Sequence, residues 1–359
     1  MTKCAVCSFP DAQPYRVIDQ VQFHECMACG SLFADPAFLA DVETGKVSNY
    51  RHAYWASEMK AARERSYGAS LQRIAETFLY CRIPVKRFID IGSGPGHLLD
   101  AISDALPQTA DMFYGVEMFP PEQELRSRHP NYKICSIGEL NEKFEAGVCI
   151  EVIEHLTPAM LSGLAAQLAK ASTPNALYLI NSGQPEYVKT EDPDYLDPHG
   201  RGHVVSYSLA GAAAIFEPHG FSVIPLPGRH WAFLIEYSST ATKSNSPIEA
   251  IEKRLWAPLA ENAETLRTGR LGSLLLDAGR DAARSYLEYA TVAQRTAWAQ
   301  SLQAYVEQLE AEIHRLRAVS ERPDRTDAGG PFVAGNNLAP SHEQNLLTRA
   351  RRWLATHTI

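Results

Sequence analysis

The chain has no long run of apolar residues and no excess of basic charge. No stretch of about 18 consecutive apolar residues occurs among the 359 residues, so we expect no membrane-spanning helix. The first residues, Met-Thr-Lys-Cys, lack the apolar core of a secretory signal peptide. The formal net charge of −8 makes a nucleic-acid partner unexpected, because nucleic-acid binding usually shows as a basic excess. These absences favour a cytoplasmic protein.

Two common phosphate-binding patterns are also missing. Residues 92–96 read G-x-G-x-G, but the dinucleotide fingerprint G-x-G-x-x-G needs a third glycine where His97 stands. The Gly-Lys-Ser/Thr ending of a P-loop is absent as well. Asp90, just before the loop, would repel a pyrophosphate but suits a cationic ligand. The sequence therefore predicts an α/β crevice for an adenosine-like ligand without phosphates.

Residues 88–102 have the pattern of a buried strand, an acid, a glycine loop and the start of a helix. This pattern resembles the first motif of the class I S-adenosylmethionine (SAM)-dependent methyltransferases, in which the loop backbone contacts the methionine part of SAM. SAM carries a sulfonium and an ammonium group and no phosphate, which agrees with an acid at Asp90. The resemblance implies that SAM is the cofactor.

Two further motifs strengthen the resemblance. Tyr114–Glu117 ends in an acid about 20 residues past the loop, where a carboxylate can accept the ribose hydroxyls. Residues 148–156, Val-Cys-Ile-Glu-Val-Ile-Glu-His-Leu, resemble the fourth-strand motif of the ubiquinone-biosynthesis-like branch of that family. The match runs from residue 70 to 237 and implies a seven-stranded Rossmann-like sheet with helices on both faces over residues 83–240.

The cofactor-binding residues follow from the same resemblance. A third strand is expected at residues 132–135, and the residues just past it would flank the adenine. The acid usual at that point is missing, since Ser136 occupies the position and Glu139 comes later. The implied SAM-binding residues are Asp90, Gly92, Ser93, Gly94, Gly96, Glu117, Met118, Ser136, Ile137, Glu151 and Val152.

Four of the seven cysteines form two pairs, Cys4-x-x-Cys7 and Cys26-x-x-Cys29, separated by 18 residues. This spacing is typical of structural zinc sites, where two tight turns present four thiolates to one ion and leave no position for water. The alternative, a redox pair, usually occurs once and beside a βαβ unit. We therefore predict a small zinc ribbon at residues 1–40. The resemblance adds that related methyltransferases acting on sugars, natural-product intermediates and ribosomal RNA carry similar ribbons.

Residues 41–82 are predicted to form a helical connector that ends in an amphipathic helix over 65–81. Tyr50, Tyr54 and Trp55 lie on or near one face of its first part. The resemblance implies a lid over the cofactor, with Tyr50 or Tyr54 near the methionine end. Packing of this helix on the ribbon is the alternative.

A long polar segment, residues 183–202, follows the expected fifth strand at 176–181. Because ligands bind at the carboxyl ends of strands in α/β sheets, we predict that this segment binds the methyl acceptor. Its carboxylates could bind a divalent ion, although acidic loop residues are more often solvated. The other elements expected after the fourth motif are helices over 157–172 and 206–219 and strands over 220–224 and 230–236.

Methyl transfer to a hydroxyl or an acidic carbon benefits from a base that takes the acceptor's proton. Histidine is the default choice because its pKa lies near neutrality. His155 is the first candidate, because it is expected to open a helix beside the sulfur end of SAM; His199 and His203 on the acceptor segment are the next. The alternative is that these side chains only cap or tie the loops.

Residues 241–320 leave the methyltransferase pattern and predict a helical extension. Leucine, valine, isoleucine and alanine recur at 3-4 spacing over 299–316, which predicts a short coiled coil and a homodimer, or packing on the chain's own domain. Residues 321–345 are rich in Pro, Gly, Asp and Asn and predict a disordered linker. Residues 346–359 predict a short basic amphipathic helix.

The sequence therefore predicts a SAM-dependent methyltransferase that acts on an oxygen or carbon of a small molecule, such as a sugar or a secondary metabolite. Two alternatives stay open. One is an RNA or protein methyltransferase that uses the ribbon for recognition, although residues 1–36 contain only Lys3 and Arg16 as basic residues. The other is a catalytically silent SAM-binding scaffold that acts through its C-terminal helices.

Overall fold

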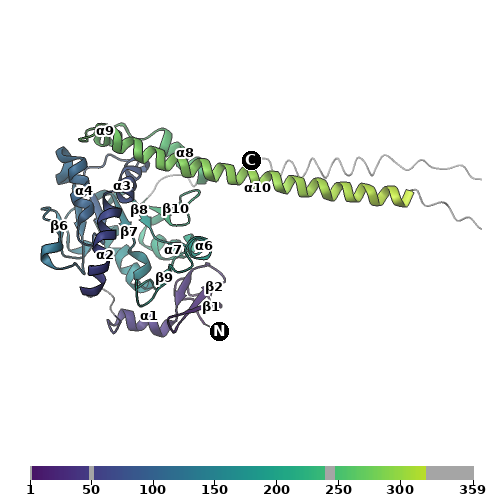
Figure 1. The fold of residues 1–359 in the computed structure, drawn as a ribbon, viewed down its shortest axis with the longest axis horizontal. Coiled ribbons are helices and arrows are strands. Elements are labelled where there is room, and N and C mark those ends of the chain that lie inside the picture. Colours follow the sequence, from purple (N-terminus) through teal and green to yellow (C-terminus); the bar gives the residue numbers. More distant parts are fainter. Residues whose placement is uncertain (1, 48–51, 239–246, 321–359) are drawn as a thin grey trace, which may run out of the picture. The chain divides into compact units, whose positions relative to one another are not determined.

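The structure is a computed structural model that describes residues 2–47, 52–238 and 247–320. The chain divides into two units, Met1–Trp298 and Ala299–Ile359. Figure 1 labels many of the helices and strands of the described residues. Tyr50, the side chain of Tyr54, the linker 321–345 and the terminal helix predicted at 346–359 lie outside what is described. None of the helices in the described ranges is long and apolar enough to cross a membrane.

A seven-stranded sheet forms the centre of the first unit, in the order β10-β11-β8-β7-β4-β5-β6. Strand β11 runs antiparallel to both of its neighbours, while β8, β7, β4, β5 and β6 pair in parallel. This topology confirms the predicted Rossmann-like methyltransferase sheet. The strands are β4 (Phe88–Ile91), β5 (Phe113–Val116), β6 (Tyr132–Lys133), β7 (Phe144–Ile150), β8 (Ser172–Asn181), β10 (Phe221–Pro225) and β11 (Ala232–Tyr237).

Alternate side chains of the strands enter two different hydrophobic clusters, because successive residues of a strand point to opposite faces. Ile89 and Ile91 join one cluster with α5 (Pro158–Ala171) and α7 (Leu209–Phe216). Phe88 joins the other with α3 (Ala69–Tyr80) and α4 (His97–Ala105). Residues of α8 (Pro247–Trp256), α9 (Ala260–Arg267) and the first part of α10 (Leu274–Ser320) belong to this second cluster. The sheet is therefore covered by helices on both faces.

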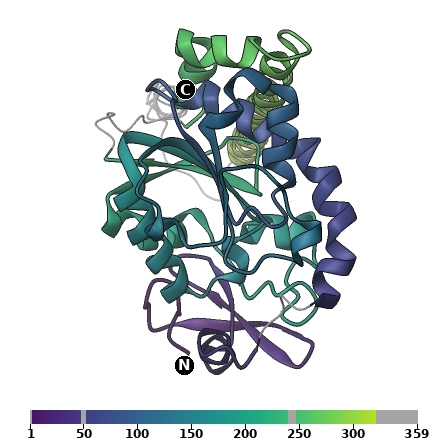
Figure 2. The ribbon, with the colours of Figure 1, turned by 90° about the vertical axis from the view of Figure 1, so that its left-hand side faces the viewer.

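A second, four-stranded sheet contains the N-terminal segment, in the order β1-β2-β3-β9. Its strands are β1 (Ala12–Ile18), β2 (Val21–Cys26), β3 (Leu32–Ala34) and β9 (Val205–Ser206). Strand β9 comes from the methyltransferase domain, so backbone pairing joins the N-terminal segment to that domain. In Figure 2 the purple N-terminal sheet lies at the opposite end of the first unit from the green helices α8 and α9.

The remaining elements connect these layers. Helix α1 (Pro36–Glu43) follows the N-terminal sheet, and α2 (His52–Ser66) precedes α3. The segment 183–202, expected as a loop, contains α6 (Pro185–Thr190) and the buried residues Tyr195 and Leu196. Its apolar side chains explain the difference, since they fill the cluster beneath the segment. The short 3₁₀ helices are η1 (Pro107–Met112), η2 (Gln123–Leu125), η3 (Ile137–Glu139), η4 (Ile153–His155) and η5 (Glu217–His219).

Candidate active site

The glycine loop turns sharply between β4 and α4. Gly92 has φ +71°, and a Cβ there would lie 2.4 Å from Val152 Cγ2, so no other residue fits without displacing that side chain. The amides of Gly92 and Ser93 both donate to the carbonyl of Val116, each at 3.0 Å. Gly96 begins α4 with φ +82°. The loop is thereby fixed against the end of β5.

Glu117, at the end of β5, and Tyr132, at the start of β6, hold the loop from the other side. The amide of Gly94 donates to Glu117 Oε2 at 2.8 Å, and the amide of Phe119 donates to Oε1 at 2.7 Å. The hydroxyl of Tyr132 donates to the carbonyl of Gly94 at 2.6 Å. A carboxylate offers about four lone-pair sites, so Glu117 retains acceptor capacity for ligand hydroxyls.

Asp90 lies at the floor of this region and is 6 % exposed. Burial, opposed by a hydrogen bond from Ser93 and aided by the neighbouring Glu117 charge, raises the pKa of its carboxyl to about 7. Burial also raises the pKa of Glu117, while backbone amides oppose that rise. A cationic ligand would favour the charged form of both groups, which is the electrostatic situation that the sequence predicts for SAM.

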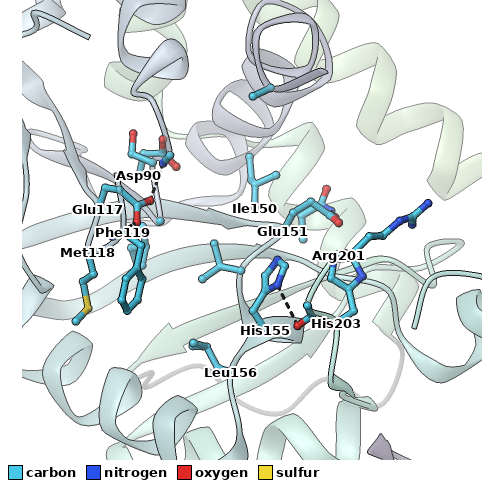
Figure 3. Close-up of a pocket in the computed structure, with 18 of the residues that line it drawn as sticks. Asp90, Glu117, Met118, Phe119, Ile150, Glu151, His155, Leu156, Arg201 and His203 are labelled. Atoms are coloured by element: carbon cyan, nitrogen blue, oxygen red, sulfur yellow. Dashed lines mark hydrogen bonds between the residues drawn. The ribbon is translucent and has the colours of Figure 1, made fainter. Parts of the chain in front are cut away.

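A cavity of about 1130 Å³ runs from the glycine loop to the acidic turn after β7. In Figure 3, Asp90, Glu117, Met118 and Phe119 lie at one end, and Glu151, His155, Arg201 and His203 lie at the other. Ten of the residues predicted to bind SAM line it: Asp90, Gly92, Ser93, Gly94, Glu117, Met118, Ser136, Ile137, Glu151 and Val152. The predicted residue Gly96 is not among the lining residues in the described chain; a Cβ there would meet Ser127 and Tyr132.

Glu151 and Glu154 belong to a tight turn that follows β7. Glu151 has φ +54°, unusual for a residue with a Cβ. Its Oε1 accepts from Asn181 Nδ2 at 2.7 Å, and its Oε2 accepts from the Tyr195 hydroxyl at 3.4 Å. Burial raises the pKa of Glu154 well above its ordinary value, and the neighbouring Glu151 charge adds to the rise.

His155 and His203 come together at this end of the cavity. The ring centroids are 4.7 Å apart, and both residues line the cavity. His155 Nδ1 lies 3.2 Å from the carbonyl of Gly202, and His203 Nδ1 lies 2.7 Å from the carbonyl of Tyr195. Burial lowers the pKa of His155 to about 4 and that of His203 well below its ordinary value. Both imidazoles are therefore neutral at pH 7.

His199, the third predicted base, is not among the lining residues of the described chain, and its ring packs at 5.4 Å against Phe38. The three aspartates of segment 183–202, which could have bound a divalent ion, each have a different partner. Asp192 pairs with Arg201 at 3.3 Å, Asp194 pairs with Arg16 at 3.7 Å, and Asp197 accepts from the Gly200 amide at 2.7 Å. Each carboxylate thus has its own partner on the protein.

Several cavity residues come from segments that the motif analysis did not connect to the site. Arg73 of α3 lies over the ring of Trp231 at 4.1 Å and donates to Asn181 Oδ1 at 3.2 Å. Trp231 in turn packs at 5.5 Å against Tyr286 of α10. No local pattern marks Arg73 or Tyr286, because only the folded sheet brings α3 and α10 to one rim. Trp55 of α2, by contrast, belongs to the connector expected to form a lid, and it lines the cavity beside Gly94.

The four cysteines of the N-terminal segment form a second candidate site. The sulfur atoms of Cys4 and Cys29 are 3.9 Å apart and those of Cys7 and Cys26 are 3.5 Å apart, with all four within 4.8 Å of one another. Four sulfurs at about 2.3 Å from a tetrahedral Zn²⁺ would be about 3.8 Å apart. Backbone amides after the first cysteine of each pair donate to its sulfur at 3.3 to 3.4 Å. All seven cysteines are free thiols.

Part of the chain is similar to known protein families and structures. Residues 59–226 match a family model described as a methyltransferase domain. No curated protein matches the chain. Among solved structures, DesVI of Streptomyces venezuelae is 17% identical, with a TM-score of 0.39, and the match covers 52% of this chain and 98% of that one.

Two further structures are similar to the chain. One is the SAM-bound CalS10, an amino pentose methyltransferase from Micromonospora echinaspora, with 15% identity, a TM-score of 0.38 and coverage of 53% of this chain and 98% of that one. The other is a 1,6-didemethyltoxoflavin-N1-methyltransferase from Burkholderia thailandensis, with 16% identity, a TM-score of 0.36 and coverage of 63% and 97%. The matched residues 59–226 contain the glycine loop, the acidic turn and many of the residues that line the cavity between them, so this part of the chain is similar to a methyltransferase domain.

Proposed function

We propose that this enzyme transfers the methyl group of SAM to an oxygen or carbon atom of a small molecule, such as a sugar or a secondary metabolite. The observation that supports this most directly is one continuous cavity whose two ends differ chemically. A pocket for one drug-sized ligand measures about 300–1,000 Å³. The cavity of about 1130 Å³ therefore has room for SAM and for a small acceptor beside it.

In this proposal the glycine-loop end binds SAM. Asp90 would attract the cationic part of the cofactor, and Glu117 would accept hydrogen bonds from the ribose hydroxyls. Ser136 and Ile137 line the cavity past β6 and would flank the adenine. These assignments place the reactive sulfonium between the loop and the turn at Glu151–Val152.

The other end would bind the acceptor. Tyr187, Tyr195, Trp231 and Tyr286 line it and offer flat apolar surfaces on which a sugar or an aromatic ring can pack. The acceptor atom would attack the methyl carbon in line, forming its bond to carbon as the sulfur–carbon bond breaks and S-adenosylhomocysteine leaves. His155 and His203 are neutral and can accept the acceptor's proton. His199 packs on Phe38, and we assign it no contact with the acceptor.

We also propose that residues 1–40 form a zinc ribbon in which the ion has a structural role. The sulfur separations of 3.5 and 3.9 Å and the absence of disulfides among the cysteines support a four-thiolate site. The ribbon would stabilise the acceptor segment, which it contacts in several places. Lys189 pairs with Glu25 at 2.6 Å, and Arg16 donates to the carbonyl of Pro193 at 2.9 Å.

The decisive experiment is methyl transfer from radiolabelled SAM by the full chain. Separate reactions would contain small-molecule extract, RNA and protein. We expect label in the small-molecule fraction, lost in Asp90→Asn and kept in the matched control Asp111→Asn, whose exposed side chain lies away from the cavity. Label in RNA or protein alone would replace the proposal with a macromolecular methyltransferase. SAM binding without transfer to any fraction would favour the silent scaffold.

A further inference from the structure

Glu154, His155 and His203 form a group of metal-ligating side chains that is separate from the four cysteines. One ligand atom from each lies within 4.8 Å of the others. All three residues are at least nine-tenths buried. We propose that they bind a divalent first-row metal ion at the acceptor end of the cavity.

Glu154 is the side chain that most needs a cation. It is 0% exposed, and neither of its carboxyl oxygens has a hydrogen-bond partner among the described residues. Burying a carboxylate without a partner is costly, and buried charges in proteins are paired or coordinate metals. Arg201 lines the same cavity, but its guanidinium already pairs with Asp192 at 3.3 Å. A metal ion between Glu154 and the histidines would supply the missing charge.

The orientation of His203 favours this interpretation over a simple hydrogen bond. Its Nδ1 donates to the carbonyl of Tyr195 at 2.7 Å, which leaves Nε2 as a lone-pair donor. Nε2 lies 3.9 Å from Glu154 Oε1. That separation is longer than a hydrogen bond, so a protonated Glu154 does not account for it. Two ligands that are each about 2.1 Å from one metal lie about 3.0 to 4.2 Å apart, and 3.9 Å fits that range.

The rings also have the support that metal-bound histidines usually have. A carbonyl contacts Nδ1 of both His155 and His203, and such partners fix the orientation of a ligating ring. The contact at His155 is the dashed line in Figure 3. Two imidazoles and one carboxylate suit Zn²⁺, Mn²⁺, Fe²⁺ or Co²⁺. Three protein ligands leave coordination positions open, and His155 and His203 line the cavity. The open positions would therefore face the acceptor.

The proposed metal site also bears on the acceptor of the proposed methyl transfer. Only this one consequence rests on the proposed function. If methyl transfer occurs here, the acceptor class is a molecule with an oxygen atom that can coordinate the ion beside SAM. The histidines would then act through the metal and not as direct bases. Metal binding itself does not depend on that consequence and can be measured alone.

The test is a titration of the full chain with Mn²⁺, after dialysis to remove weakly held metal. Mn²⁺ prefers oxygen and nitrogen ligands and leaves the thiolate site to zinc. Electron paramagnetic resonance of free Mn²⁺ reports binding without any activity measurement. We expect one Mn²⁺ per chain, an affinity at least about tenfold lower in Glu154→Gln and in His203→Gln, and no change in the control His314→Gln on the exposed face of α10.

SAM binding measured on the same samples identifies variants that remain folded. If Glu154→Gln loses SAM binding as well, His203→Gln and the wild-type titration decide the question. A wild-type chain that binds no Mn²⁺, and no Zn²⁺ or Co²⁺ beyond the cysteine-bound ion, overturns the inference. Wild-type affinity in both ligand variants overturns it too. Neither result bears on the proposed SAM-dependent methylation. That proposal is contradicted only if the radiolabel experiment shows no transfer to small molecules.

Discussion

Protonation of Asp90 should control SAM binding near neutral pH. Burial raises the pKa of this carboxyl to about 7 in the unliganded protein. Only the ionised form attracts the cofactor's positive charges, so the apparent dissociation constant equals the intrinsic one divided by the ionised fraction. From pH 7 to pH 5.5 that fraction falls from about one half to about 3%, which predicts affinity lower by about 15-fold, or about 1.6 kcal/mol.

A rise in pH should strengthen SAM binding through Asp90 but lower the stability of the unliganded protein. A carboxyl whose pKa is raised by folding contributes stability that is present below its ordinary pKa of 3.8 and lost as the pH rises through about 7. The rise corresponds to about 4 kcal/mol at most. Asp90→Asn therefore should make the unliganded protein more stable at pH 8 while it weakens SAM binding.

Isothermal titration calorimetry at pH 7.0, 6.5, 6.0 and 5.5 measures the first effect, and thermal unfolding without ligand measures the second. Asp111→Asn is the matched control, because its exposed side chain should leave both profiles unchanged. A wild-type SAM affinity that stays constant over this range would refute the reasoning. So would a pH dependence that persists unaltered in Asp90→Asn.

Three further predictions test other parts of the molecule. Gly92→Ala should cost about 1–3 kcal/mol of stability, measured by urea unfolding, because its Cβ meets Val152; a second change, Val152→Ala, should recover part of that loss. After dialysis that removes weakly held metal, metal analysis should find one zinc per chain that is lost in Cys4→Ser and kept in Cys135→Ser; a metal-free wild type would contradict the ribbon. If α10 pairs two chains, light scattering should give a dimer that Ile313→Glu, at a position 39% exposed, converts to monomer, whereas a monomeric wild type would rule out the pairing.

The cofactor end was predictable because its signals are local. A strand, a glycine loop and a helix follow one another within residues 88–102, and their backbone geometry depends on neighbours in the sequence. The position of Glu117 was predictable as well, because strand–helix–strand units have a regular length and the acid at the end of the second strand comes about 20 residues after the loop. The positive φ values of Gly92 and Gly96 agree with the conformations that only glycine adopts easily. The seven-stranded fold was implied by the resemblance of these motifs to the methyltransferase family, and the sheet order confirms it.

The acceptor end was less predictable because its residues are far apart in the chain. The segment 183–202 is polar in composition, yet Tyr195 is buried and contacts both Gly183 and Glu151 through its hydroxyl. Polarity alone cannot show that one tyrosine in a polar segment turns inward. Similarly, the periodicity of α10 predicts a helix but not that Tyr286 reaches the cavity, since that depends on where the helix packs.

The position of strand β9 connects the ribbon to the chemistry proposed for the cavity. Val205 pairs with Phe33 of the ribbon, and the adjacent Val204 donates its amide to the carbonyl of Glu154. His203 directly precedes Val204 in the chain. The position of its backbone therefore depends on the pairing of Val205 with Phe33 and on the hydrogen bond from Val204 to Glu154. A loosened ribbon would therefore release the backbone that carries His203 before it disturbed the glycine loop. A zinc ion bound by the four cysteines would in this way affect the acceptor end of the cavity without touching SAM or the acceptor.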